Sequence, residues 1–130
     1  MSEDHVSQPM AQRLRDAGWK GETEKAWVPY RTGFTTFEWQ LWETSNGSYR
    51  FMPGWLPAPS IGELLVELPE PALIKGVSCA LYISRVAHDP TSWAVWYESL
   101  SDRDDVPITK HSKNLADALA GVWLAKEGEG

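Results

Sequence analysis

The clearest hydrophobic pattern in the chain is helical and begins at Ser60. Ser60 and Glu63 have the spacing of a capping box, in which the serine hydroxyl accepts from the Glu63 backbone N–H and the carboxylate reaches back. Apolar side chains then recur at i, i+3, i+4 and i+7, namely at Ile61, Leu64, Leu65 and Leu68. Pro69 cannot continue the helix. The pattern predicts a short amphipathic helix over residues 60–68.

Two further segments have helical periodicity. Over residues 7–18, Ser7 is placed to cap a helix, apolar side chains fall at Met10, Leu14 and Ala17, and Gly18 supplies the left-handed end. Over residues 114–126, Asn114 is placed to cap and Asp117 suits the first turn. The expected buried stripe of this last helix is Leu115, Ala118, Leu119, Val122 and Trp123.

Alternating patterns predict strands in two regions. In the first, Phe37, Trp39 and Leu41 alternate with Glu38, Gln40 and Trp42. Residues 45–48 then form a turn signal, and 49–52 are expected to return as the second strand of a hairpin, followed by a loop over 53–59. In the second region, strands are expected at 77–87, 93–100 and 106–111, with turns at 88–91 and 101–105.

Together these elements predict an α+β fold. A small antiparallel sheet, made of a hairpin and a three-stranded meander, would be packed by about three short helices. With 130 residues the chain fits a single domain over residues 1–130, with 1–6 and 127–130 frayed. Hydrophobic residues make up 42% of the chain, which excludes an intrinsically disordered protein.

Charge and cysteine content narrow the classes of function. The formal net charge is −6 and the cations are spread evenly, so double-stranded nucleic acid is not an expected partner. Small anions need only two or three cations and stay open as ligands. One cysteine excludes a disulfide scaffold. The polar start and the lack of a long apolar run predict a cytoplasmic protein that does not enter a membrane.

Motifs for catalysis and for metals are missing from the sequence. His5, His88, His111 and Cys79 lack ligand spacing, so neither a metal nor a cofactor is expected. Cys79 falls in the middle of an expected strand, which favours a buried structural thiol. No nucleophile elbow and no phosphate-binding loop occur. An enzyme is therefore disfavoured but left open, because Glu38, Glu43, Glu98 and Asp102 could meet in space.

The eight tryptophans are the unusual feature of the composition. Trp39, Trp93 and Trp123 fall on expected core stripes, and Trp42 and Trp96 fall in the opposite register. Trp19, Trp27 and Trp55 are expected in loops, where an indole either covers the edge of a core or lines a binding surface. Tyr30–Arg31 and Tyr49–Arg50 add cations beside aromatic rings. The candidate binding residues are Trp27, Tyr30, Arg31, Trp42, Arg50 and Trp55.

Residues 58–65, 116–124 and 14–19 carry a resemblance. Residues 58–65 read APSIGELL, residues 116–124 read ADALAGVWL, and residues 14–19 read LRDAGW. The pattern resembles short uncharacterised bacterial and prophage proteins, in which a Pro-Ser/Thr-x-x-Glu-Leu helix precedes a small hairpin and an Ala-x-Ala-Leu-Ala-x-x-Trp-Leu helix closes the chain. The resemblance implies an α+β fold and a phage or mobile-element origin, and it implies no catalytic activity.

These observations lead to two main hypotheses. The first is a non-enzymatic phage-type protein that binds a host protein in the bacterial cytoplasm, as an anti-defence or regulatory factor. The second is a protein that sequesters a nucleotide-like ligand, with Arg31 or Arg50 at the phosphate and an indole stacked on the base. An enzyme with an unrecognised site is a third. An exposed aromatic patch is also compatible with a homodimer.

Overall fold

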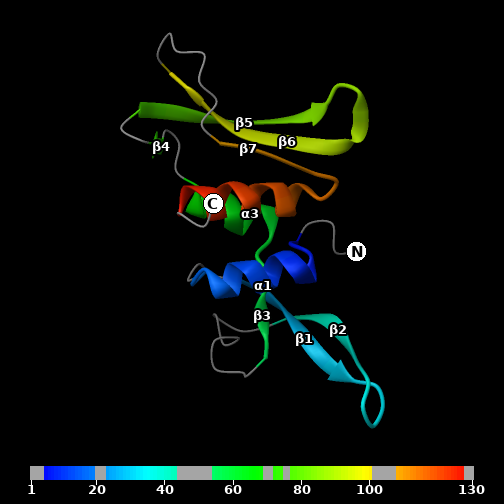
Figure 1. Cartoon of the computed structure of the whole chain (residues 1–130). Coiled ribbons are helices and arrows are strands. Elements are labelled where there is room, and N and C mark those ends of the chain that lie inside the picture. The colour runs from blue at the N-terminus through cyan, green and yellow to red at the C-terminus, as the bar shows by residue number, and fades with distance from the viewer. Residues whose placement is uncertain are drawn as a thin grey trace.

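The structure is a computed structural model that describes residues 5–19, 23–43, 54–68, 72–74, 77–100 and 108–127. These residues form three helices and two antiparallel sheets, so the predicted α+β class is confirmed (Figure 1). In chain order the elements are α1 (Gln8–Asp16), β1 (Lys25–Arg31), β2 (Phe37–Glu43), β3 (Leu56–Pro57), α2 (Ile61–Glu67), β4 (Ala72–Ile74), β5 (Val77–Val86), β6 (Asp89–Ser99), β7 (Ile108–Ser112) and α3 (Leu115–Lys126).

The larger sheet has the order β4-β5-β6-β7 and contains the predicted meander. Its turn is tighter than expected, because β5 and β6 are joined at Ala87 and His88 and β6 already begins at Asp89. The Asp89 carboxylate stabilises the start of β6. It accepts from the Thr91 backbone N–H at 3.2 Å, the Thr91 hydroxyl at 2.6 Å and the Ser92 hydroxyl at 2.8 Å.

These hydrogen bonds make the start of β6 sensitive to acid. The bonds from Thr91 and Ser92 hold the pKa of Asp89 below its ordinary value of 3.8, and Lys113 adds a smaller effect. A carboxylate whose pKa is lower in the folded than in the unfolded state stabilises the fold. This contribution is fully present above the unfolded pKa and is lost as the pH falls through the folded pKa. Asp89→Asn should therefore lower Tm at neutral pH, and the difference from the unmodified chain should shrink below pH 3.8. Thermal melts over a pH series test this, and a pH-independent difference would contradict it.

The smaller sheet has the order β2-β1-β3 and contains a β1–β2 hairpin that the sequence did not predict. The described partner of β2 is β1, which precedes it, with Lys25 opposite Glu43 and Arg31 opposite Phe37. The expected turn at 45–48 and the returning strand at 49–52 lie outside the described residues. Pro29 obscured β1 in the sequence, because proline disfavours a strand interior. It is accommodated beyond Ala26 and Trp27, the residues that pair with β3.

The helix ends follow the local sequence signals in most cases. The Ser60 capping box forms, with the Glu63 N–H 3.2 Å from Ser60 Oγ and the Ser60 N–H 2.8 Å from Glu63 Oε1. Asn114 caps α3, and Gly18 follows α1 with φ +84°. The Ser7 hydroxyl makes no capping bond, contrary to prediction. Its backbone N–H instead donates to Asp117 Oδ1 at 2.7 Å, which ties α1 to α3.

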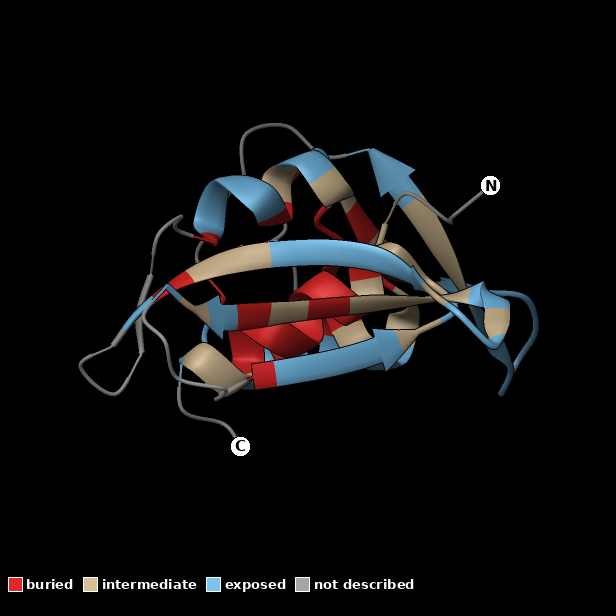
Figure 2. Ribbon diagram, turned by 90° about the horizontal axis from the view of Figure 1, so that it is seen from above, coloured by how far each residue is buried: buried red, intermediate tan, exposed pale blue. Residues whose placement is uncertain are grey.

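The core is centred on α3, which lies between the larger sheet and α1 (Figure 1). Every residue of α3 from Ala118 to Leu124 is buried, and Figure 2 shows the helix beneath the strands. The predicted one-sided stripe is therefore wrong: α3 is covered on several sides. Trp19 and Trp123 meet edge to face, with ring centroids 4.9 Å apart. Cys79 is buried in β5, as predicted.

The core also includes the chain before α1. Val6 is fully buried. Residues 5 and 6 are therefore packed against the rest of the chain, whereas the sequence predicted that they would be frayed. The Val6 N–H donates to the Pro59 carbonyl at 3.3 Å, and the His5 carbonyl accepts from Asn114 Nδ2 at 3.0 Å. None of the described helices is long and apolar enough to cross a membrane.

Candidate functional site

Three of the six candidate binding residues come together on the smaller sheet. Tyr30 lies on β1, Trp42 on β2, and Trp55 directly before β3. The ring centroids of Tyr30 and Trp42 are 5.9 Å apart, and those of Trp42 and Trp55 are 6.0 Å apart with the rings nearly perpendicular. Both distances are within the range of favourable aromatic contacts. We call these three residues the aromatic row.

The strand register explains why the aromatic row forms. Tyr30 is opposite Glu38 and Trp42 is opposite Ala26, so these side chains share one face of the hairpin. Val28 lies on the same face between Ala26 and Tyr30 and is only 4% exposed. Val28 is not a member of the α3-centred core cluster, whereas Ala26 on the same face is. The row therefore extends outward from the core, because Trp55 packs against the core cluster while Tyr30 and Trp42 are exposed.

A line of hydrogen bonds along β2 orients the central ring of the row. Trp42 Nε1 donates to Gln40 Oε1 at 2.9 Å, and Gln40 Nε2 donates to Glu38 Oε1 at 2.9 Å. These bonds hold the indole in one orientation while Trp42 stays 39% exposed and Tyr30 45% exposed. The face thus presents ordered aromatic rings beside the exposed carboxylate of Glu38.

Exposed aromatic side chains continue around the end of the hairpin, which projects away from the helices (Figure 1). Phe34 in the β1–β2 turn is 93% exposed. On the opposite face Phe37 is 58% exposed and makes an edge-to-face contact with Trp39 at 5.9 Å. We call the aromatic row together with Phe34 and Phe37 the hairpin surface. Of the nine large hydrophobic side chains exposed in the described ranges, four belong to it: Tyr30, Phe34, Phe37 and Trp42.

The remaining three candidates do not join the hairpin surface. Trp27 is on a strand, not in a loop, and it packs against the core with Nε1 donating to the Val6 carbonyl at 2.8 Å. Arg31 is bound within its own turn, where Nε donates to the Gly33 carbonyl at 3.0 Å and Nη2 to the Phe34 carbonyl. Trp27 and Arg31 thus make hydrogen bonds within the chain. Arg50 lies outside the described residues.

Sequence reasoning missed Phe34 and Phe37 as surface residues. The alternation from Phe37 to Trp42 correctly separates two faces, and Trp39 and Leu41 do pack against the core. The core, however, ends before Phe37. Alternation reports which face a side chain occupies and carries no signal for how far the core extends along a strand. For Phe34, its position directly after Gly33 in a turn was an available signal of exposure.

The carboxylates considered for catalysis are not brought together. Glu38 and Glu43 lie on β2, whereas Glu98 lies on β6 in the other sheet, on the far side of α3 (Figure 1). Asp102 lies outside the described residues. Within the part of the chain that the structure describes, no group of three or more His, Cys, Asp or Glu side chains could hold a metal ion.

The hairpin surface is suited to burial against another molecule. Its rings are large and partly or almost fully accessible, and tryptophan and tyrosine are enriched among the residues that dominate the energetics of protein interfaces. A backbone turn held by Arg31 keeps the end of the hairpin in place. Comparisons with protein-family models, with curated proteins and with solved structures found no match for this chain.

Proposed function

We propose that this chain is a protein-binding module whose hairpin surface docks on a partner protein of a bacterial host. The observation that carries the proposal is the concentration of exposed aromatic rings on a projecting hairpin. Exposed apolar groups that gather on one element, here on both faces and the turn of one hairpin, are typical of interaction sites. The resemblance to prophage proteins is the reason to look for the partner among host proteins, where an anti-defence or regulatory role would follow.

The restrained conformation of the aromatic side chains favours binding, because little conformational entropy remains to be lost. Fixing a mobile side chain at an interface costs roughly 0.5–1.5 kcal/mol. In the aromatic row Trp42 is already restrained by Gln40 and by its contacts with Tyr30 and Trp55. Trp55 is held in turn, because its carbonyl accepts from Arg15 Nη1 of α1 at 2.6 Å. Less conformational entropy is then lost when a partner covers the row.

The charges around the hairpin surface indicate the chemistry of the partner. Glu38 and Glu43 on β2 are balanced by Lys25 and Arg31 on β1, so the two strands carry no net charge. A complementary partner has an apolar groove whose border carries both acidic and basic side chains. Small-molecule sites are concave, whereas this surface surrounds a projecting turn. Two of the five Arg31 donors are already used by the Gly33 and Phe34 carbonyls, which leaves fewer for the phosphate of a nucleotide.

A site-specific cross-linker tests the proposal in cells. The photoreactive residue p-benzoyl-phenylalanine would replace Phe34 and, in a separate variant, Thr109, which is exposed on β7 of the other sheet. In bacteria, irradiation should give one discrete adduct from position 34 and none from position 109. Equal labelling from both positions would contradict docking through the hairpin, and an adduct of twice the chain mass would indicate a homodimer instead.

A paired variant measures how much the aromatic row contributes. Combining Tyr30→Ser with Trp42→Ser should lower the yield of the position-34 adduct at least about tenfold, because interface rings of this kind are often worth more than 1 kcal/mol each. Tyr82→Ser is the matched control, since Tyr82 is similarly exposed, at 41%, on the larger sheet. Circular dichroism would confirm that each variant is folded. An unchanged yield in the paired variant would overturn the role of the row.

A further inference from the structure

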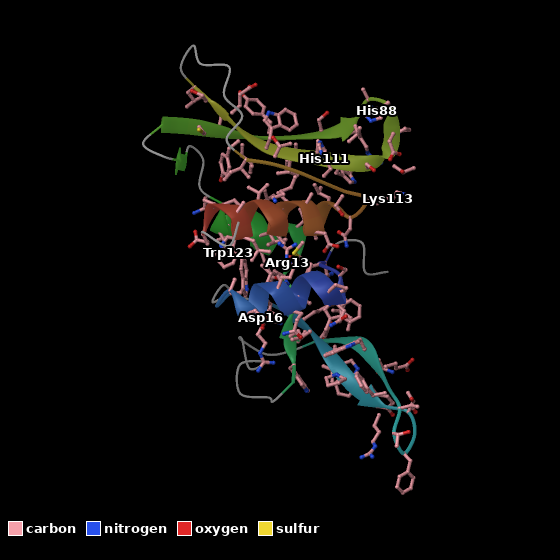
Figure 3. All side chains as sticks on the ribbon, in the orientation of Figure 1. Arg13, Asp16, His88, His111, Lys113 and Trp123 are labelled. Carbon is pink, nitrogen blue, oxygen red and sulfur yellow. The ribbon has the colours of Figure 1, made fainter. Side chains whose placement is uncertain are left out.

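A second feature lies at the end of the larger sheet where β5 turns into β6. A cavity of about 350 Å³ opens there between the sheet, α2 and the start of α3. It is lined by Ile61, Arg85, Pro90, Thr91, Trp93, Lys113 and Leu115. The volume is near the lower end of small-molecule sites, roughly 300–1,000 Å³. Figure 3 shows Lys113 at this end of the sheet, between the last strand and α3.

Arg85 is held in a fixed position at the cavity. Its guanidinium carbon is 4.1 Å from the centre of the Trp93 ring, and Nη1 donates to the Pro90 carbonyl at 2.6 Å. The register places Arg85 directly opposite Trp93 on β6. A guanidinium has five N–H donors, and the described part of the chain uses one of them. The others are suited to a carboxylate or a phosphate group.

Lys113 adds a second positive charge from another part of the chain. It is exposed and precedes Asn114, the cap of α3, whose N-terminal end carries partial positive charge. Asp89 is a carboxylate that interacts with Lys113, and it is already hydrogen-bonded by Thr91 and Ser92. With Arg85, Lys113 and Asp89 counted, the cavity keeps a net positive charge on an acidic protein.

Besides the cations and Thr91, the cavity has apolar walls. Ile61 at the start of α2 and Leu115 at the start of α3 are half-buried and pack against the core, and the Trp93 indole is half-buried as well. An inorganic anion would leave these walls in contact with water. A ligand with an apolar or aromatic part would cover them and gain about 25 cal/mol per Å² of apolar surface removed from water.

We propose that this cavity binds a small organic anion. Its carboxylate or phosphate group lies between Arg85 and Lys113, and its apolar part lies against Ile61, Trp93 and Leu115. This site is separate from the hairpin surface, since it is built by β5, β6, α2 and α3. The proposal of anion binding therefore does not depend on the proposal of partner binding.

Three probes with one ring and different charges test the site: benzoate, phenyl phosphate and neutral benzamide. Titrations followed by ¹H–¹⁵N NMR should give saturable shifts at the Trp93 indole N–H with either anion. Benzamide should bind at least about tenfold more weakly, because it lacks the charge-assisted hydrogen bonds. The stronger of the two anions identifies the class of ligand. Equal binding of benzamide, or no saturable shift with either anion at millimolar concentration, would overturn the proposal.

Substitutions distinguish the contribution of Arg85 and Lys113 to anion binding from the effect of the net charge of the protein. Lys113→Met and Arg85→Met should each weaken binding of the preferred anion at least about tenfold. Lys113 is exposed, so its variant retains the fold even if Arg85→Met does not. Lys25→Met is the matched control, because Lys25 lies on β1 in the other sheet and its loss changes the net charge equally. An equal effect of Lys25→Met and Lys113→Met would show that overall charge, and not the cavity, governs binding.

Discussion

Replacement of Trp123 by alanine is expected to lower the free energy of unfolding by about 3–5 kcal/mol, the usual cost of truncating a large buried aromatic side chain. Trp123 is only 8% exposed and lies on the α1 side of α3 (Figure 3). Its ring meets Trp19 edge to face at 4.9 Å, so the truncation also removes an aromatic pair. Domains of this size are stable by about 5–15 kcal/mol, and the loss is therefore a large part of the total.

Urea denaturation followed by far-ultraviolet circular dichroism measures this loss. The matched control is Trp96→Ala, which removes the same side chain from the opposite face of the larger sheet. Trp96 is half-buried and stacks on Tyr82 at 5.6 Å, a contact worth about 0.5–1.5 kcal/mol beyond its burial. Trp123→Ala should be clearly the more destabilising of the two. Equal losses would mean that the helix layer between the sheets is not the main core.

Removal of the Glu63 carboxylate is expected to cost about 2–3 kcal/mol, the second-largest effect. Oε1 accepts from the Ser60 N–H at 2.8 Å as part of the capping box. Oε2 accepts from the Glu24 N–H, also at 2.8 Å, at the point where the chain enters β1. Glu63→Ala therefore leaves two backbone donors without this partner. One belongs to the helix and the other to the strand leading to the hairpin surface.

Two companion variants make this prediction specific. Glu63→Gln keeps a single amide oxygen as acceptor, so it should lose roughly half as much stability as Glu63→Ala. Glu67→Ala removes an exposed carboxylate from the same helix and should change stability by less than about 0.5 kcal/mol. Urea denaturation of the three variants supplies the comparison. If Glu63→Ala were no worse than Glu67→Ala, the contact between α2 and β1 would carry no stability.

Signals confined to a few adjacent residues were the most predictable. The capping box at Ser60, the cap at Asn114 and the glycine end of α1 each depend on backbone groups within four residues, and all three are observed. The meander was equally predictable from the sequence, because clear alternation and a short turn leave a strand few possible pairing partners other than its neighbour. The exception was Ser7, whose backbone is bound by Asp117 from the other end of the chain.

The candidate site was half predictable. Tyr30, Trp42 and Trp55 were chosen as aromatic side chains outside the expected core, and they do form one row. Trp27 was assigned to a loop because Pro29 concealed the strand around it. Its role in holding Val6 is a contact across 21 positions that no local pattern reports.

The sequence by itself determined the α+β class, the helix boundaries and the alternation of faces along the strands, because these follow from backbone capping and side-chain periodicity. Only the tertiary structure decided that β2 pairs with β1, that α3 is buried on several sides, and that Arg85 and Lys113 border one cavity. Periodicity states which side chains of an element point the same way. Which surface covers them, and where that cover ends, depends on elements far apart in the chain.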